Sequence, residues 1–341
     1  MYNQIIINIF KELQLYWEIK EDIHRANAYR NAISSLESYS NSILNINDVP
    51  DLPGLGKRSI EKIKMIINGA TLRDFIPHDD LKIMQAYSEL IKIKDVGRTQ
   101  AIKWINNFKV YSLKDLKTKV NKGKIKLTDG QKIGVKYYRD LNSPIPRSEI
   151  IKLDKIVQKT VKKLDIDLDA YILGSYRRHK PFSNDLDLLL TSSRIPTAKH
   201  LYSADSMINS FVGQLSKFGV QQICIKTGKS VSKKGRKSIN LEYLWKYSNY
   251  WRKVDLKFFA YESKIPAILY FTGSRNFNKR IRERLKQIGY MLNQYGLYKK
   301  KLKTHRTGKK GGIKYIPVPV KSEEDIFMIA KMKYIPPEKR I

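Results

Sequence analysis

Gly174-Ser175-Tyr176-Arg177-Arg178, followed closely by Asp185-Leu186-Asp187-Leu188-Leu189-Leu190, decides how the second half of the chain should fold. Side chains alternate between the two faces of an extended strand, so Asp185 and Asp187 should point the same way while the leucines between them point toward a core. The glycine permits a tight turn, and arginine binds phosphate oxygens through paired hydrogen bonds. The two stretches predict a carboxylate pair beside a turn that cradles phosphate.

A third carboxylate, Asp255, lies much later in Val254-Asp255-Leu256, which also has the pattern of a strand. Carboxylates from two strands make a set of hard oxygen ligands suited to Mg²⁺, and two such ions can serve the attacking and leaving oxygens of phosphoryl transfer. This combination predicts a nucleotidyl transferase. The alternative is that Asp185 and Asp187 are solvated residues at a strand end.

The charge of the chain favours a polyanionic partner. There are 66 Lys and Arg residues against 32 Asp and Glu, a formal net charge of +34, and the basic residues run through the whole sequence. Nucleic acid is the expected partner. The longest apolar segment, residues 5–10, is short and interrupted by Asn8, so we expect no membrane association and a soluble, intracellular protein.

Cys224 is the single cysteine and cannot form an internal disulfide. It lies in the apolar alternation Gln222-Ile223-Cys224-Ile225, so we expect a packed strand residue rather than a nucleophile. This cysteine content fits a reducing compartment.

The first 76 residues have helical periodicity, with apolar side chains recurring at three- and four-residue spacing. These positions are Ile6, Ile7, Phe10, Leu13, Tyr16, Tyr29, Ile33 and Leu36. The pattern predicts a small helical module.

Two glycine turns indicate how this region contacts DNA. In Leu52-Pro53-Gly54-Leu55-Gly56-Lys57-Arg58 two glycines flank a leucine before a basic helix start, and Ile93-Lys94-Asp95-Val96-Gly97-Arg98 is a weaker copy with Asp95 at the first glycine. Such helix-hairpin-helix turns present backbone N–H groups to a DNA phosphate. Pro-Gly turns are common, so one copy is weak evidence. Two copies favour a grip on the DNA backbone without sequence reading.

From about residue 148 the pattern becomes α+β. We expect a helix at 148–163 and strands at 171–173 and 220–225. The stretch 226–237, rich in Lys, Gly and Ser, is expected to be a solvated loop. A DNA contact is the second interpretation of this stretch, and a nuclear-import signal at 233–237 is the third. Residues 269–271 read as an apolar strand ending at Gly273, with a basic helix from Asn276 that could hold a nucleotide. Residues 299–314 read as a second mobile loop.

Taken together, these stretches resemble the family X DNA polymerases, most of all the beta-type members, over nearly the whole chain and in the same order. The resemblance is carried by His24-Arg25-Ala26-Asn27-Ala28-Tyr29-Arg30, Leu52-Pro53-Gly54-Leu55-Gly56, Gly174-Ser175-Tyr176-Arg177-Arg178, Asp185-Leu186-Asp187-Leu188-Leu189, Leu269-Tyr270-Phe271-Thr272-Gly273-Ser274, Ser322-Glu323-Glu324-Asp325-Ile326-Phe327 and Lys333-Tyr334. Because the sequence opens directly on the helical module, we expect a beta-type enzyme rather than a larger member with a protein-interaction domain there.

The resemblance implies four domains. Residues 1–76 would form a helical lyase-like domain with the first helix-hairpin-helix, and residues 77–142 a helical DNA-binding subdomain with the second. Residues 143–258 would form the catalytic palm with a mixed β-sheet, and residues 259–341 a smaller α+β subdomain that selects the nucleotide.

For the palm, the resemblance implies a two-metal mechanism. Asp185 and Asp187 would bridge two Mg²⁺ ions, which Mn²⁺ can replace, and Asp255 would bind only the catalytic ion beside the primer 3′-hydroxyl, whose proton it would accept. Ser175 and Arg178 would hold the triphosphate of a deoxynucleoside triphosphate.

For the nucleotide, the resemblance implies that Tyr270, Phe271 and Gly273 pack against the sugar and help to exclude ribonucleotides. Asn278 would reach the incoming base, and Arg282 the minor groove of the template.

The resemblance also implies a 5′-deoxyribose-phosphate lyase, with Lys62 as its Schiff-base nucleophile. Neighbouring cations would lower the pKa of this amine and favour its neutral form; they are Lys57, Arg58 and Lys64. His24 and Arg25 would bind the 5′-phosphate, and Tyr29 would line the pocket. The plain alternative is that Lys62 is a solvated helix lysine.

Several positions depart from the family pattern. Asn184 stands where a glycine offers its backbone to the triphosphate, and Pro144 where an arginine helps to bind it. Arg275 replaces an acidic residue near the incoming base. Lys257 and Gln294 replace an Arg and a Glu that stabilise open and closed states.

The hypothesis from sequence is a DNA-templated repair polymerase that fills short gaps in base excision repair, with an associated lyase, acting as a monomer on gapped or nicked double-stranded DNA. The sequence leaves two cellular locations open for this protein, the nucleus and a cytoplasmic viral factory. One alternative is an error-tolerant or template-independent transferase, and another is a DNA-binding protein with an inactive catalytic domain. RNA nucleotidyl transferases share the Gly-Ser and Asp-x-Asp elements, but the paired hairpins favour DNA.

Overall fold

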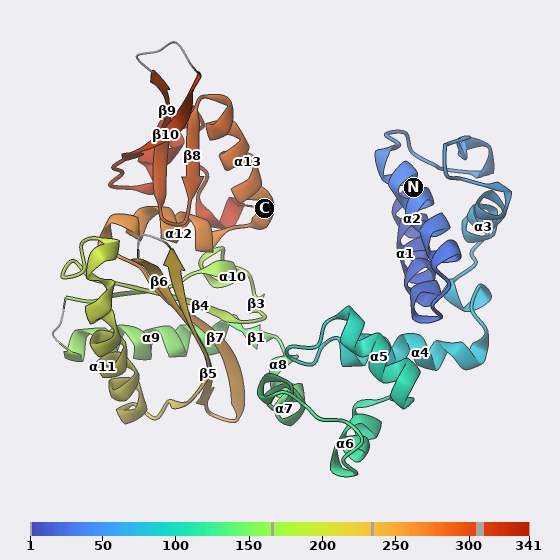
Figure 1. Cartoon of the computed structure of the whole chain (residues 1–341), viewed down its shortest axis with the longest axis horizontal. Coiled ribbons are helices and arrows are strands. Elements are labelled where there is room, and N and C mark those ends of the chain that lie inside the picture. Colours follow the sequence, from blue (N-terminus) through green and yellow to red (C-terminus); the bar gives the residue numbers. More distant parts are fainter. Residues whose placement is uncertain (1, 165–166, 233–234, 305–309, 341) are drawn as a thin grey trace. The chain divides into compact units, whose positions relative to one another are not determined.

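The computed structural model describes residues 2–164, 167–232, 235–304 and 310–340. The chain divides into two compact units, Met1–Tyr138 and Arg139–Ile341. The first is helical and the second combines helices with β-sheets (Figure 1), so the predicted α+β fold is confirmed. Within the described ranges, no helix is both long enough and apolar enough to cross a bilayer.

Unit 1 is built from helices that bury one apolar face each. In order they are α1 (Asn3–Ile19), α2 (Ile23–Ser38), α3 (Lys57–Ile67), α4 (Leu81–Leu90), α5 (Arg98–Phe108), α6 (Leu113–Asn121) and α7 (Asp129–Lys136), with short 3₁₀ turns η1 (Ile46–Asp48), η2 (Leu72–Asp74) and η3 (His78–Asp80). The periodic apolar residues predicted for the first two helices all lie in this core. A short helix, α8 (Tyr138–Leu141), leads into the second unit.

Unit 2 contains a five-stranded sheet in the order β2-β4-β7-β6-β5. Its strands are β2 (Asp169–Ile172), β4 (Leu186–Thr191), β5 (Gln221–Ser232), β6 (Gly235–Tyr247) and β7 (Tyr250–Phe258). Pairing of β4 with β7 is parallel and the other pairings are antiparallel. The apolar faces of α9 (Arg147–Leu164) and α11 (Ala204–Lys217), which follows the 3₁₀ turn η4 (Ala198–Ser203), share a core with the sheet.

A second sheet lies in the C-terminal part of unit 2. After η5 (Tyr261–Ser263) come α12 (Lys264–Thr272), α13 (Arg275–Gln287), β8 (Tyr290–Asn293), β9 (Gly296–Thr304), β10 (Lys310–Val318), α14 (Glu323–Ile329) and η6 (Pro337–Lys339). The strands form an antiparallel sheet in the order β10-β9-β8, seen in the orange and red part of Figure 1.

The predicted strand at residues 269–271 is wrong, because this segment is the end of helix α12. Its apolar run is buried on most sides, including Ala267, Ile268 and Leu269. A short continuous apolar run does not distinguish a buried strand from a buried helix. The break at Gly273 and the basic helix that follows are as expected.

Both lysine-rich loops were also predicted wrongly. Most of residues 226–237 belongs to the antiparallel β5–β6 hairpin, and most of residues 299–314 to β9 and β10. Lysine and glycine disfavour strands only weakly, and pairing with a neighbouring strand overrides that preference. Residues 233–234 of the proposed import signal, and residues 305–309 of the second segment, lie outside the described residues.

Cys224 lies in a strand as predicted, but its side chain is exposed rather than packed. The reason is that β5 is the edge strand of its sheet. Its ladder with β6 also has an irregularity between Cys224 and Lys226. The apolar alternation around the cysteine therefore does not continue into a buried face.

One ion network connects the turn after β2 with the C-terminal segment. The Glu323 carboxylate accepts hydrogen bonds from Arg177 at 2.8 and 2.9 Å and from Arg340 at 2.8 and 3.2 Å. Glu323 is 6% exposed, and the Arg340 side chain is fully buried, with its guanidinium 5.0 Å from the ring centre of Phe277. Each buried charge is paired, as burial in a low-dielectric interior requires.

Replacing Glu323 with alanine should lower the free energy of unfolding of the whole chain by about 3–5 kcal/mol, because it leaves the buried Arg340 charge unpaired. Burial raises the pKa of Glu323, but the two guanidinium groups outweigh it and hold that pKa below its ordinary value. The stabilisation is therefore present above the unfolded glutamate pKa, about 4.3, and is lost as pH falls through the folded value. Urea unfolding against pH measures both effects. Glu324→Ala, at the exposed neighbouring position, is the control; equal unfolding free energies for the two variants would contradict the assignment.

Candidate active site

The parallel pairing of β4 with β7 brings the predicted carboxylates together. Asp187 lies directly opposite Asp255 in the ladder, and Asp185 precedes Asp187 by two residues, on the same side of the extended chain. The leucines that alternate with them, Leu186, Leu188 and Leu190, are at most 2% exposed. The alternation read from the sequence therefore fixes the sheet face on which the carboxylates lie.

Two lysines from β7 lie among these carboxylates, and the sequence analysis missed the first of them. The Lys253 ammonium is 3.5 Å from Asp255 Oδ1 and 3.7 Å from Asp185 Oδ2. The Lys257 ammonium is 2.9 Å from Asp187 Oδ1 and 4.0 Å from Asp255 Oδ2. Both are two residues from Asp255 on the same strand, so they share its face.

The electrostatics show how strongly the acidic groups interact. Burial raises the pKa of Asp185, and the neighbouring Asp187 carboxylate raises it further. Burial alone would lower the pKa of Lys253, but Asp255 and Asp185 outweigh this effect, so its pKa lies above the ordinary value. The carboxylates therefore hold Lys253 in its charged form.

The donor chemistry fits Mg²⁺, because every candidate ligand is a carboxylate oxygen. In the described part of the chain, however, no group of three acidic, histidine or cysteine side chains converges as a formed metal site. Lysine ammonium groups lie at the carboxylates instead. A divalent ion held by Asp185, Asp187 and Asp255 would take over the charge balance that Lys253 and Lys257 provide here.

The Gly-Ser turn lies directly beside the carboxylates. Gly174 begins α10 (Gly174–Arg177) with φ at +59°, and a Cβ added there would lie 2.5 Å from Asp187 Oδ2. Ser175 hydrogen-bonds Ser183 at 2.7 Å. The Arg178 guanidinium donates to the Thr272 carbonyl. The turn thus places the predicted phosphate-binding side chains between β4 and the end of α12.

The residues predicted to contact the nucleotide also form one continuous group. Lys257 lies 4.8 Å from the ring centre of Phe271, which joins this group to the carboxylates. The Asn278 amide donates to the Tyr270 carbonyl at 2.7 Å, and Arg282 Nε donates to the Asn278 carbonyl at 2.9 Å. Gly273 ends α12 with φ at +66°. Helices α12 and α13 therefore carry the predicted sugar, base and template contacts side by side.

The departures from the family pattern lie on several elements of unit 2, and Lys257 is among the carboxylates themselves. Pro144 precedes a two-stranded ribbon of β1 (Ile145–Pro146) and β3 (Phe182–Ser183), and the exposed Asn184 follows it. Asparagine tolerates left-handed backbone geometry better than most residues, but Asn184 does not adopt a positive φ. Arg275 is the first residue of α13, and Gln294 lies in the β8–β9 turn.

In unit 1 the two predicted hairpin turns have matching backbones. Leu55 N donates to the Leu52 carbonyl, and Val96 N to the Ile93 carbonyl. Gly54 and Asp95 have positive φ, at +91° and +57°, so the aspartate adopts the conformation expected of the glycine it replaces. Gly56 and Gly97 are the residues that precede α3 and α5, and Arg58 lies in the first turn of α3. Both turns expose helix N-termini of the kind that bind phosphate.

The predicted lyase residues lie on different helices of unit 1. Lys62 is on α3, with its ammonium 5.7 Å from the Phe75 ring centre. His24 and Arg25 lie in the first turn of α2, where the Arg25 guanidinium stacks 4.1 Å from the Trp17 ring centre, and Tyr29 is buried one turn further on. Among the described residues, no hydrogen bond, ion pair or ring contact joins Lys62 to these three.

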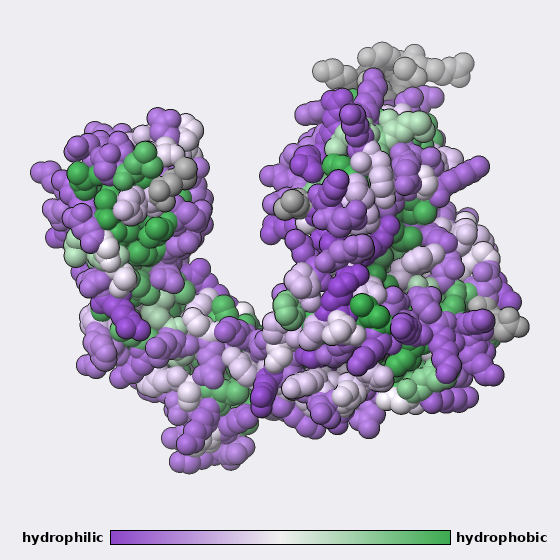
Figure 2. Space-filling model, turned by 180° about the vertical axis from the view of Figure 1, so that it is seen from behind, coloured by the Kyte–Doolittle hydropathy of each residue, from purple (hydrophilic) through white to green (hydrophobic). Residues whose placement is uncertain are grey.

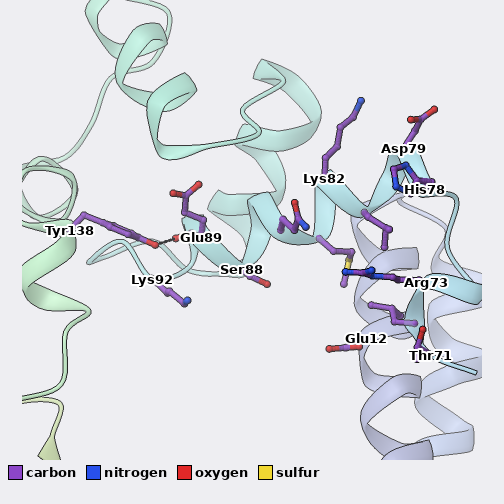
Figure 3. Close-up of a pocket in the computed structure, with 14 residues that line it drawn as sticks. Glu12, Thr71, Arg73, His78, Asp79, Lys82, Ser88, Glu89, Lys92 and Tyr138 are labelled. Atoms are coloured by element: carbon purple, nitrogen blue, oxygen red, sulfur yellow. Dashed lines mark hydrogen bonds between the residues drawn. The ribbon is translucent and has the colours of Figure 1, made fainter. Parts of the chain in front are cut away.

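A hollow of about 1210 Å³ in unit 1 lies along α4, and none of the predicted lyase residues lines it. Figure 3 shows Lys82, Ser88 and Glu89 along this helix, and Lys92 just beyond its C-terminal end. Its walls carry both signs of charge, with Arg73 and Lys82 against Glu12 and Glu89. Because Glu89 is already bound to Leu113 N at 3.0 Å, we assign no chemistry to this hollow.

The surface agrees with a polar partner. Figure 2 shows that hydrophilic residues cover most of the visible face of each unit, with smaller hydrophobic areas between them. A Gly-Ser turn beside acidic strand residues on a mixed sheet is the arrangement expected of a nucleotidyltransferase.

Comparison with known families assigns nearly the whole chain. Residues 144–261 match the DNA polymerase beta palm, and residues 267–341 the DNA polymerase beta thumb. Residues 88–142 match the fingers domain of DNA polymerase lambda, and residues 1–72 a helix-hairpin-helix domain. The chain belongs to the family X DNA polymerases.

Curated relatives are similar over the same length. The chain is 27% identical over 344 residues to DNA polymerase lambda of Rattus norvegicus, covering 99% of this chain and 56% of that protein. It is 25% identical over 346 residues to DNA polymerase lambda of Arabidopsis thaliana, covering 99% and 62%. DNA nucleotidylexotransferase of Xenopus laevis is 24% identical over 362 residues, covering 99% and 68%. The chain thus spans less than two thirds of the two polymerases.

Gly174→Ala should destabilise the protein by about 1–3 kcal/mol, because a non-glycine residue is strained at positive φ and its Cβ would collide with Asp187. Gly213→Ala is the matched control: Gly213 lies within α11, where an added Cβ meets nothing within 4 Å. That change should stabilise by about 0.5–1 kcal/mol through helix propensity. Thermal unfolding of both variants measures the difference, and shifts of the same sign would contradict this account of the turn.

Proposed function

We propose that this chain is a DNA-directed DNA polymerase that fills short gaps in duplex DNA during base excision repair. The observation that carries the proposal is the register of β4 against β7, which sets Asp187 opposite Asp255. Membership of the family supports the same reaction. The proposed substrates are deoxynucleoside triphosphates and gapped or nicked double-stranded DNA, and the proposed active form is a monomer.

In this proposal the carboxylate face positions the reacting groups. Asp255 lies beside the primer 3′-hydroxyl and accepts its proton, while Asp185 and Asp187 are the residues that would hold the divalent metal ions. Bound Mg²⁺ would neutralise the triphosphate and favour the ionised hydroxyl. Ser175 and Arg178 orient the phosphates from the turn after β2.

Nucleotide selection is assigned to the group on α12 and α13. Tyr270, Phe271 and Gly273 pack against the sugar, where a 2′-hydroxyl would meet the end of α12. Asn278 contacts the incoming base and Arg282 the template minor groove. Their mutual hydrogen bonds hold these side chains in place before the nucleotide binds, which reduces the entropy lost on binding.

We assign binding of the DNA backbone to the two helix-hairpin-helix turns of unit 1. Gly54 and Gly56 in the first, and Gly97 in the second, allow the backbone to approach a phosphate. Arg58 adds charge to the first turn of α3. The formal net charge of +34 supports sequence-independent binding of this kind.

A lyase activity on a 5′-deoxyribose phosphate is the second part of the proposal. Lys62 attacks the C1′ aldehyde as a neutral amine, and His24 and Arg25 hold the 5′-phosphate beside Tyr29. The family resemblance of residues 24–30, and the position of Lys62 that it implies, support this assignment. The substrate would have to connect α2 and α3, since Lys62 makes no described contact with the other three residues.

Template-independent addition is a second candidate activity. The similarity to DNA nucleotidylexotransferase of Xenopus laevis, 24% identical over 362 residues, favours its consideration, as does the basic Arg275 where the family has an acidic residue near the incoming base. Mg²⁺-dependent extension of a single strand without template separates the two activities.

Asp255→Ala should abolish nucleotide incorporation on a one-nucleotide gap while leaving DNA binding intact, because it removes the proposed proton acceptor and metal ligand. Single-turnover extension measures incorporation, and fluorescence anisotropy with labelled gapped DNA measures binding. The matched control is Asp169→Ala, at the opposite end of the strands, where Asp169 pairs with Thr191 and Lys264. Substantial residual incorporation by Asp255→Ala would refute its role.

Lys62→Ala should retain gap filling but lose covalent trapping, because borohydride reduces only an imine between an amine and the aldehyde. The measurement is trapping on DNA with a 5′-deoxyribose phosphate. Lys117→Ala, an exposed lysine of α6 in the same unit, should trap like the wild type. Undiminished trapping by Lys62→Ala would place the nucleophile elsewhere.

A further inference from the structure

The antiparallel β10-β9-β8 sheet (Figure 1) packs one of its two faces into the protein. On that face Leu292, Leu297 and Val318 share a core with apolar side chains of α13 and α14. Side chains alternate between the two faces of a strand. The residues next to these three therefore point to the opposite face, away from that core.

The opposite face carries tyrosine and lysine in adjacent rows. Tyr298 pairs with Met291 on one side and with Pro317 on the other, and Lys300 pairs with Tyr315. Tyr298 and Tyr315 are thus diagonal neighbours, which lie about 7–8 Å apart in a sheet. Tyr315 is 43% exposed, and Lys300 is exposed as well. We call Tyr298, Lys300 and Tyr315 the tyrosine-lysine face.

A groove of about 840 Å³ continues from this face toward the start of β6. Both tyrosines of the face line it, together with Tyr261, Tyr295 and Lys237. The Lys237 ammonium lies 5.4 Å from the ring centre of Tyr295, so a cation and an aromatic ring are adjacent there too. None of the residues assigned above to the nucleotide, the metal ions or the lyase lines this groove.

The charge around the groove favours an anionic occupant. Residues 296–321 contain lysine and arginine but no Asp or Glu. Among the residues that the structure describes, neither Lys237 nor Lys300 has a carboxylate partner. The acidic residue in the lining is Glu262, whose carboxylate already accepts a hydrogen bond from a backbone N–H at 3.0 Å. A groove whose lysines keep their charge free raises the local concentration of phosphate groups.

The chemistry of the face selects a nucleic acid with unpaired bases. Aromatic side chains stack on bases of any sequence while a positively charged groove follows the backbone, which is how single strands are bound without sequence preference. Exposed sheet faces present aromatic rings to bases in this way. Addition of a protein strand at the β10 edge is disfavoured, because Pro317 has no N–H to donate.

We propose that the tyrosine-lysine face and its groove bind single-stranded DNA, with bases stacked on Tyr298 and Tyr315 and backbone phosphates at Lys300 and Lys237. The occupant is DNA because the chain belongs to the family X DNA polymerases. Binding here does not depend on the proposed gap-filling activity. Duplex DNA does not compete for the face, because its bases are already stacked on one another.

Photocrosslinking of the full-length wild type locates the site. The probe is a short single strand that contains 5-iodouracil, which crosslinks to aromatic side chains stacked on it. An excess of unlabelled duplex DNA occupies the duplex-binding surfaces, and mass spectrometry identifies the crosslinked peptide. The expected result is a crosslink at Tyr298 or Tyr315. Crosslinks confined to residues outside the groove would overturn the proposal.

Fluorescence anisotropy with the same strand, again with excess duplex, gives the Kd for Tyr298→Ala, Tyr315→Ala and the double variant. Each single change should weaken single-strand binding about fivefold or more, with the Kd for gapped duplex within about twofold of wild type, because one stacked base is lost. Tyr298→Phe keeps the ring and should bind like the wild type. Tyr250→Ala is the matched control, since Tyr250 is 42% exposed and pairs with Tyr247 at the far end of β6 from Lys237.

Three outcomes of the binding experiment would overturn the proposal. The first is a double variant that folds, by its thermal unfolding, and binds the single strand like Tyr250→Ala. The second is an equal loss of affinity for the single strand and for gapped duplex, which would place these tyrosines on the duplex path. The third is a dimer in sedimentation that the double variant loses while keeping its single-strand affinity, which would assign the face to a second copy of the chain. If Tyr298→Ala does not fold, the exposed Tyr315→Ala and the crosslink decide.

Discussion

The parallel pairing of β4 with β7 is the constraint on which the active site depends. Its register sets Asp187 opposite Asp255, and a shift by one residue would turn one carboxylate into the core. The buried leucines of β4 prevent that shift, because they would lose their apolar contacts. Gly174 must then pass close to Asp187, which requires a residue without a Cβ. The register of β4 against β7 and the glycine at position 174 are therefore both needed to form the carboxylate site.

The charges of the molecule are arranged around this face. Lys253 and Lys257 balance the carboxylates, and Lys257 also lies on the ring of Phe271, so the acidic face and helix α12 are in direct contact. Behind the turn, Glu323 holds Arg177 and Arg340. Arg177 thus has a structural role, whereas Nε of the adjacent Arg178 is buried and has no hydrogen-bond partner within the described residues. These adjacent arginines differ because, within the described ranges, Arg177 is hydrogen-bonded to a carboxylate and Arg178 is not.

The sequence predicted the elements whose signals are local. The periodic core of the first helices, the two hairpin turns and the alternating face of β4 all follow from spacing alone. It could not predict that residues 269–271 are helical, or that the lysine-rich segments pair as strands, because tertiary burial and strand partners decide those structures. The contact of Arg177 with Glu323 could not be predicted either, since the two residues lie far apart in the chain. The roles of the site residues remain predictions, and so does the four-domain division.

The most direct test of the account is Mg²⁺-dependent extension on a duplex with a one-nucleotide gap and a 5′-phosphate, with each of the four deoxynucleotides supplied separately. The account predicts that the wild-type chain inserts the complementary nucleotide selectively, because the carboxylate face and the groups on α12 and α13 act on one templated base pair. Indiscriminate addition would contradict templated selection. DNA binding without any addition would contradict the central claim that this face is catalytic.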